Sequence, residues 1–196
     1  MCSSDLAKLG GTMAYDEDHA AEIGGRFDRV AYFLELQKAG GALQYVYASM
    51  DAFTTDLRKV GIPTAASGAV FQMPVTNLTV LSNVPGLKTG EAMDGGNIEF
   101  WPHNYGTQNG ASVPGAAGDV YDWGDATFDP VDGYGSMQVH NGAAKQTVFA
   151  INNWKAAAGA DLGIGNSEGK TRDWTFTGNA HTCPVKRLRV LVRPAP

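Results

Sequence analysis

Residues 97–134 gather aromatic rings, amides and acidic side chains in one short stretch of the chain. Flat rings can stack on the apolar faces of a sugar, while their polar atoms and nearby amides bond its hydroxyl groups. Loops on a rigid scaffold often carry such sites. The residue types and their spacing therefore predict a carbohydrate-binding surface. Its candidate contact residues, in this stretch and just after it, are Trp101, His103, Asn104, Tyr105, Trp123, Tyr134, Gln138 and His140.

The same stretch contains five aspartates, Asp119, Asp122, Asp125, Asp129 and Asp132. Ca²⁺ takes about six to eight oxygen ligands at flexible spacing, so a structural calcium ion is one interpretation of these residues. They lack the spacing and the final glutamate of the helix-flanked calcium loop. Aspartates that begin turns and bond their own backbone are the other interpretation, and the sequence leaves both open.

Acid–base catalysis is an alternative interpretation of this region. Glu99 and Asp132, with His140, could serve a glycan-active hydrolase, either an esterase or a glycosidase. A carboxylate buried beside the histidine would favour this alternative, because perturbed acids cluster at functional sites. Nucleophilic catalysis has less support, since the serine of residues 133–136 stands one position late for a nucleophile elbow and no Gly-Asp-Ser block occurs. We therefore expect a non-catalytic chain, with the hydrolase and a structural or interaction module of a multidomain protein as alternatives.

The composition favours a loop-rich β protein. Charged residues make up 18% of the 196 residues and glycines number 25, which argues against a helical bundle or a disordered tail. The formal net charge of -5 argues against a nucleic-acid partner. No apolar run reaches the roughly 18 residues of a membrane helix, so we expect no membrane partner.

Hydrophobic alternation indicates about ten short strands. Hairpin signals join residues 27–37 to 43–50 at Gly40-Gly41, and residues 136–140 to 147–152 through Asn141-Gly142. Residues 53–60 have the pattern of one short helical turn. The other expected strands cover residues 69–73, 78–82, 97–101, 161–165, 174–177 and 187–192. This regular spacing predicts an all-β fold, a single β-sandwich of jelly-roll type over residues 7–196, with at most one or two helical turns.

Residues 1–6 are set apart from this expected domain. The sequence Cys-Ser-Ser-Asp-Leu at residues 2–6 is what the end of a common sequencing adapter, TGCTCTTCCGATCT, encodes in one reading frame. We therefore expect residues 1–6 to be non-native and the chain to be a fragment of a longer protein.

Several strings of the sequence resemble an accessory β domain of secreted bacterial proteins described as sialate O-acetylesterases; among them are FDRVAYFLELQ, GGNIEFWPHNYG, DPVDGYGSMQVHN and VKRLRVLVRP. The resemblance spans residues 9–194 and excludes the catalytic domain of that family, whose Gly-Asp-Ser block is absent here. It implies an extracellular or periplasmic location and a polysaccharide or other glycan as ligand. It also implies a covalently linked or co-secreted hydrolase domain as partner, and it transfers no catalytic residue to this chain.

Overall fold

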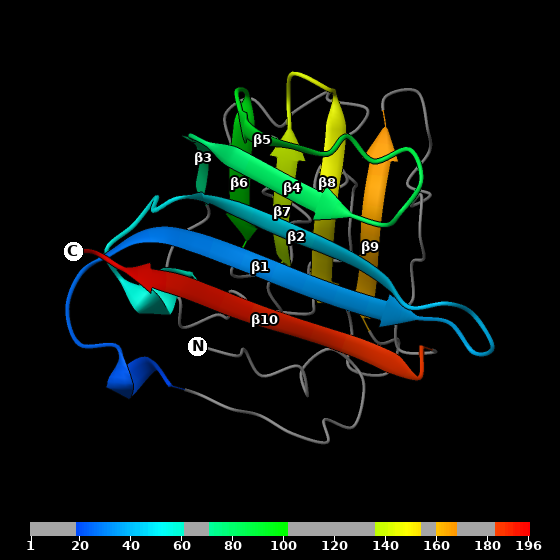
Figure 1. Cartoon of the computed structure of the whole chain (residues 1–196), viewed down its shortest axis with the longest axis horizontal. Helices are drawn as coiled ribbons and strands as arrows, with labels where there is room; N and C mark the ends of the chain where they lie inside the picture. Colours follow the sequence, from blue (N-terminus) through cyan, green and yellow to red (C-terminus); the bar gives the residue numbers. More distant parts are fainter. Residues whose placement is uncertain (1–18, 61–70, 102–135, 154–159, 168–182) are drawn as a thin grey trace.

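The computed structural model describes residues 19–60, 71–101, 136–153, 160–167 and 183–196. In this part of the chain ten strands form two antiparallel sheets, with the strand orders β10-β1-β2-β4-β5 (sheet 1) and β3-β6-β7-β8-β9 (sheet 2). One sheet lies over the other, and the strands of the two sheets cross steeply (Figure 1). The all-β, two-sheet fold expected from the sequence is therefore confirmed.

Sheet 1 is built around the hairpin of its first two strands. Its members are β1 (Phe27–Gln37), β2 (Gln44–Asp51), β4 (Leu78–Ser82), β5 (Gly90–Met93) and β10 (Val185–Pro194). The β1–β2 turn falls at the expected glycine pair, where Gly40 has a φ of 71 degrees that glycine adopts without strain. Apolar residues alternate along β1, so every second side chain enters the core.

Sheet 2 comprises β3 (Phe71–Val75), β6 (Gly96–Trp101), β7 (Ser136–Asn141), β8 (Gln146–Asn153) and β9 (Ala160–Ser167). Pro74 lies in β3 at the edge of the sheet, where a residue without an N–H is tolerated. Strands β6 to β9 form a meander, each pairing with the next. A jelly roll is built from Greek keys instead, so that part of the expected fold is not confirmed.

The hydrophobic core lies between the two sheets. Tyr32 of β1 packs on Phe149 of β8 with ring centroids 5.7 Å apart, and its buried hydroxyl donates to the carbonyl oxygen of Val60 at 2.9 Å. Burial of a large apolar side chain contributes about 1.5–3 kcal/mol, so this layer is the main source of stability. Its other large, fully buried members are Leu34, Leu36, Met50, Leu78, Ile98, Met137 and Ile151.

The helical elements of the described residues are two 3₁₀ turns, η2 (Ala20–Glu22) and η3 (Leu57–Lys59). η3 falls within the segment 53–60 that the sequence indicates as a helical turn. No helix in this part of the chain is long and apolar enough to cross a membrane. The expected strand 174–177 lies outside the described residues, whereas β5 has no counterpart among the expected strands.

Candidate functional site

A buried group of polar residues lies on the outer face of sheet 2, the face turned away from the core. The alternate residues of β6 and β7 are apolar and enter the core, so the residues between them face outward. Register places Glu99 opposite Gln138, and Asn97 opposite His140. Across a bulge in the β7–β8 ladder, His140 stands opposite Thr147. We call these five residues the polar cluster.

Four of the five residues of the polar cluster are almost completely removed from solvent, and Asn97 is partly buried. Gln138 and Thr147 have no exposed surface, while Glu99 and His140 are each 1% exposed. Charged and amide side chains are seldom buried to this degree unless other groups satisfy them, because burial of an unsatisfied polar group is unfavourable. The cluster is therefore a candidate functional site.

The imidazole ring of His140 has a polar neighbour beside each of its two nitrogens. Its Nδ1 lies 3.2 Å from Oγ1 of Thr147, and its Nε2 lies 3.9 Å from Oε2 of Glu99, which exceeds hydrogen-bond length. Burial of the imidazole disfavours its charged form and lowers the pKa of His140 from 6.5 to about 3. The ring is therefore neutral at neutral pH, with one nitrogen that donates and one that accepts.

The side-chain amide of Gln138 is the unsatisfied group of the cluster. Among the described residues, neither its Nε2 nor its Oε1 has a hydrogen-bond partner, although both atoms are buried. Oδ1 of Asn97 is also buried without a partner in this part of the chain. An orphaned buried amide costs about 1–3 kcal/mol per unsatisfied group, so the arrangement favours occupation by a polar molecule.

The other candidate residues of the sequence are placed less completely. Trp101 ends β6, opposite Ser136 of β7 in register. His103, Asn104, Tyr105, Trp123, Tyr134 and all five aspartates of the proposed calcium site lie outside the described residues. Within the described ranges, no group of three or more His, Cys, Asp or Glu side chains could hold a metal ion. The structure thus brings together Gln138, His140 and Glu99, of which the last was proposed only for the hydrolase alternative.

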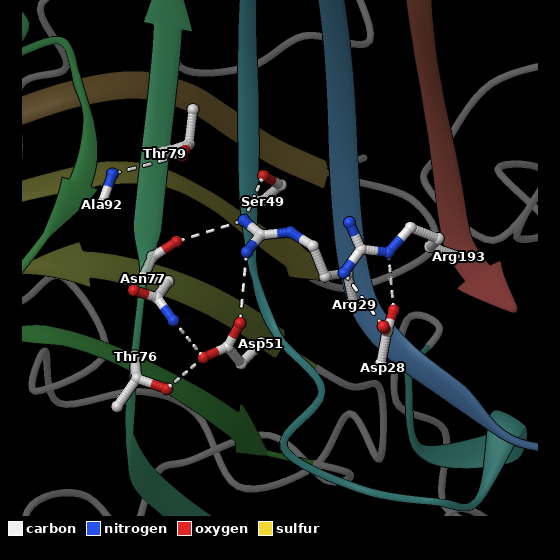
Figure 2. A network of polar contacts seen from close by, with 9 residues as sticks. All are labelled: Asp28, Arg29, Ser49, Asp51, Thr76, Asn77, Thr79, Ala92 and Arg193. Atoms are coloured by element: carbon white, nitrogen blue, oxygen red, sulfur yellow. Dashed lines mark hydrogen bonds and ion pairs between the residues drawn. The ribbon is translucent and has the colours of Figure 1, made fainter. Parts of the chain in front are cut away.

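A second polar network, on the outer face of sheet 1, has internal partners instead (Figure 2). Asp51 accepts hydrogen bonds from Arg29 at 3.1 Å and from Thr76 at 2.7 Å, and a further one from Asn77. Arg29 also bonds Oγ of Ser49 at 2.9 Å. Because these groups satisfy one another, the network ties the β3–β4 turn to β1 and β2 and does not require a ligand.

Thr147 was missed by reasoning from the sequence. It begins the expected strand 147–152 and carries no distinguishing pattern of its own. Only the bulge between Val139 and His140 brings it opposite the histidine. The spacing of Gln138 and His140, two residues apart on one expected strand, and the same spacing of Asn97 and Glu99 on another, are the sequence signals that place members on one face.

With the geometry of the site established, comparison with known proteins adds no relative. No protein-family model, no curated protein and no solved structure matches this chain.

Proposed function

We propose that this chain is a non-catalytic glycan-binding module of a secreted carbohydrate-active protein, with its ligand site on the outer face of sheet 2. The observation that carries the proposal is the buried, unsatisfied amide of Gln138. A sugar hydroxyl both donates and accepts hydrogen bonds, so it matches an amide that offers N–H and C=O groups. Asn97 adds a second buried acceptor on the same face.

The remaining parts of the proposed site follow from the sequence. Trp101, at the end of β6, and the rings beyond it supply stacking surfaces, and the five aspartates supply oxygen ligands for a calcium ion. The partner is a hydrolase domain that acts on the bound polysaccharide. Because Gln138 has no exposed surface, a ligand reaches it only when this face opens, and association should be slower than about 10⁵ M⁻¹ s⁻¹.

Replacement of Gln138 by methionine tests the proposal with two readouts. Methionine has a similar unbranched shape but no amide, so the variant no longer buries two unsatisfied polar atoms. We expect Gln138→Met to stabilise the ligand-free protein by about 1 kcal/mol and to abolish glycan binding. Denaturant unfolding measures the first effect, and a glycan array followed by calorimetry, with and without calcium, measures the second.

Gln44→Met is the matched control, because Gln44 also has a buried oxygen without a hydrogen-bond partner in the described part of the chain but lies in β2 of sheet 1. It should retain wild-type glycan binding. A folded wild-type chain that binds no glycan refutes the proposed function. Loss of stability in Gln138→Met, without any effect on binding, would instead assign the amide a structural role.

A glycan-active hydrolase is the second candidate, and one observation favours it. Glu99 and His140 are both buried, and their facing side-chain atoms lie 3.9 Å apart, which is the juxtaposition of acid and imidazole that such chemistry needs. Hydrolysis of acetylated or glycosidic substrates by the wild type, lost in both Glu99→Gln and His140→Gln, would establish this activity. Turnover that survives both substitutions would exclude the pair as catalytic residues.

A further inference from the structure

The outer face of sheet 1 carries an apolar row where a solvated face would be polar. Register aligns Arg189 of β10, Phe33 of β1, Tyr47 of β2 and Leu81 of β4 across four neighbouring strands. The alternate positions on these strands enter the core, so the row faces outward. We call these four residues, together with Tyr45 beside them on β2, the outer row. Strands that are apolar on both faces are typical of sheets that are covered on both sides.

The outer row forms one connected apolar surface. Phe33 packs edge-on against Tyr45 and Tyr47, with ring centroids 5.9 and 6.4 Å apart. The guanidinium of Arg189 lies 5.3 Å from the centre of the Phe33 ring. Leu81, which ends the row, is 46% exposed, and Leu43 at 40% is the other exposed large hydrophobic residue of the described chain. Tyrosine, phenylalanine and arginine are enriched at protein interfaces.

The two edges of this face carry opposite charge. On the β10 edge, Nη1 atoms of Arg187 and Arg189 lie 3.3 and 2.9 Å from a single oxygen of Glu35, so two cations share one carboxylate. The edge therefore has a net positive charge. The β5 edge carries exposed Glu91, and exposed Asp94 follows the strand.

We propose that a second copy of this chain covers the outer face of sheet 1. A two-fold axis parallel to the strands and passing by β2 would stack the two outer rows and reverse the strand order of the second sheet. The basic β10 edge of each copy would then face the acidic β5 edge of the other. Such a self-complementary, isologous contact closes as a dimer.

The size of the face predicts a reversible dimer. Five strands at about 4.8 Å and the length of β2 at about 3.3 Å per residue give roughly 24 by 26 Å. β4 and β5 are shorter than β2, so this area is an upper limit. The area of this face therefore lies somewhat below the roughly 800 Å² that each partner buries in a standard interface. The monomer should therefore predominate in dilute solution and the dimer in concentrated solution.

Sedimentation velocity over a wide range of concentrations tests the proposal. The wild-type chain should shift from monomer to dimer as its concentration rises. Leu81→Asp removes no hydrogen bond and places a charge within the contact, one strand from its centre, so it should remain monomeric throughout. A wild type that is monomeric at every concentration overturns the proposal, as does a dimer that persists in Leu81→Asp.

A charge exchange tests the predicted arrangement of edges. In a homodimer of either Arg187→Glu or Glu91→Lys, the β10 edge of each copy would face a β5 edge of like charge. Each variant alone should therefore lose the dimer. An equimolar mixture should regain it, because every edge then faces its opposite charge. Glu22→Lys, the same charge change outside both sheets, is the control and should dimerise like the wild type. Folding of each variant is checked by circular dichroism, and a mixture of folded chains that stays monomeric overturns the arrangement.

Discussion

Acid should destabilise this protein through His140. The folded state holds the imidazole neutral with a pKa of about 3, whereas a histidine in the unfolded chain has a pKa of 6.5. Between these values only the unfolded state takes up the proton. The contribution of His140 to stability is therefore fully present above pH 6.5 and is lost progressively as the pH falls toward 3.

The size of the effect follows from the two pKa values. Below pH 6.5 the free energy of unfolding should fall by about 1.4 kcal/mol for each pH unit. Integrated from about pH 7.5 to pH 5, the loss attributable to His140 is roughly 2 kcal/mol. A chain of this size should then lose about 4–8 °C in melting temperature. That loss is a large fraction of the roughly 5–15 kcal/mol by which native proteins are stable.

Urea unfolding at a series of pH values measures this loss. His140→Gln removes the titrating group. Between about pH 7.5 and pH 5 the variant should therefore lose about 2 kcal/mol less stability than the wild type, whatever its stability at neutral pH. His19→Gln, at the other described histidine, is the control: His19 lies 2.9 Å from a carboxylate oxygen of Glu22, so its removal should not reduce the loss of stability in acid. Equal slopes for wild type and His140→Gln would refute the reasoning, because they would mean that His140 gains its proton equally in the folded and unfolded states.

Three further substitutions test the packing around the two sheets, each by denaturant unfolding. Tyr32→Phe leaves the buried carbonyl of Val60 without its donor and should destabilise by about 1–3 kcal/mol; an unchanged midpoint would mean that water replaces the hydroxyl. Gly96→Ala would place a Cβ 2.9 Å from Cγ2 of Val75, so a loss of about 1–3 kcal/mol is expected, and a neutral result would show that this side chain can move. Asp51→Ala removes the acceptor of three side chains, and because the carboxylate is partly exposed the loss should be only about 1 kcal/mol; no loss would make the network dispensable.

Local pattern predicts most of the described strands. The bounds of β1 and β4 coincide with the expected residues 27–37 and 78–82, because their apolar alternation is strong and turn residues flank them. The local pattern does not predict β5. It has four residues, Glu91 and Ala92 are exposed, and Ala92 has a positive φ of 49 degrees, so only its pairing with β4 defines the strand.

Long-range pairing sets the limit for the site and the sheet order. The positions of Gln138 and His140 on one face follow from strand periodicity. Their approach to Glu99 and Thr147 depends on the β6–β7 register and on the bulge in the β7–β8 ladder, which sequence patterns do not encode. The meander of β6 to β9 likewise depends on which strands pair with each other. Sequence patterns do not encode that pairing, so they support a sandwich in general and not the jelly-roll strand order.

The two outer faces of the sandwich should act independently. Gln138 and Leu81 lie on opposite outer faces of two sheets, and stacked sheets are separated by about 10 Å. Effects of substitutions at that separation usually add. In the double variant Gln138→Met/Leu81→Asp, loss of glycan binding and loss of the dimer should therefore each equal the loss in its single variant. If Leu81→Asp alone weakened glycan binding, the dimer would contribute to the site, and independence of the two faces would be wrong.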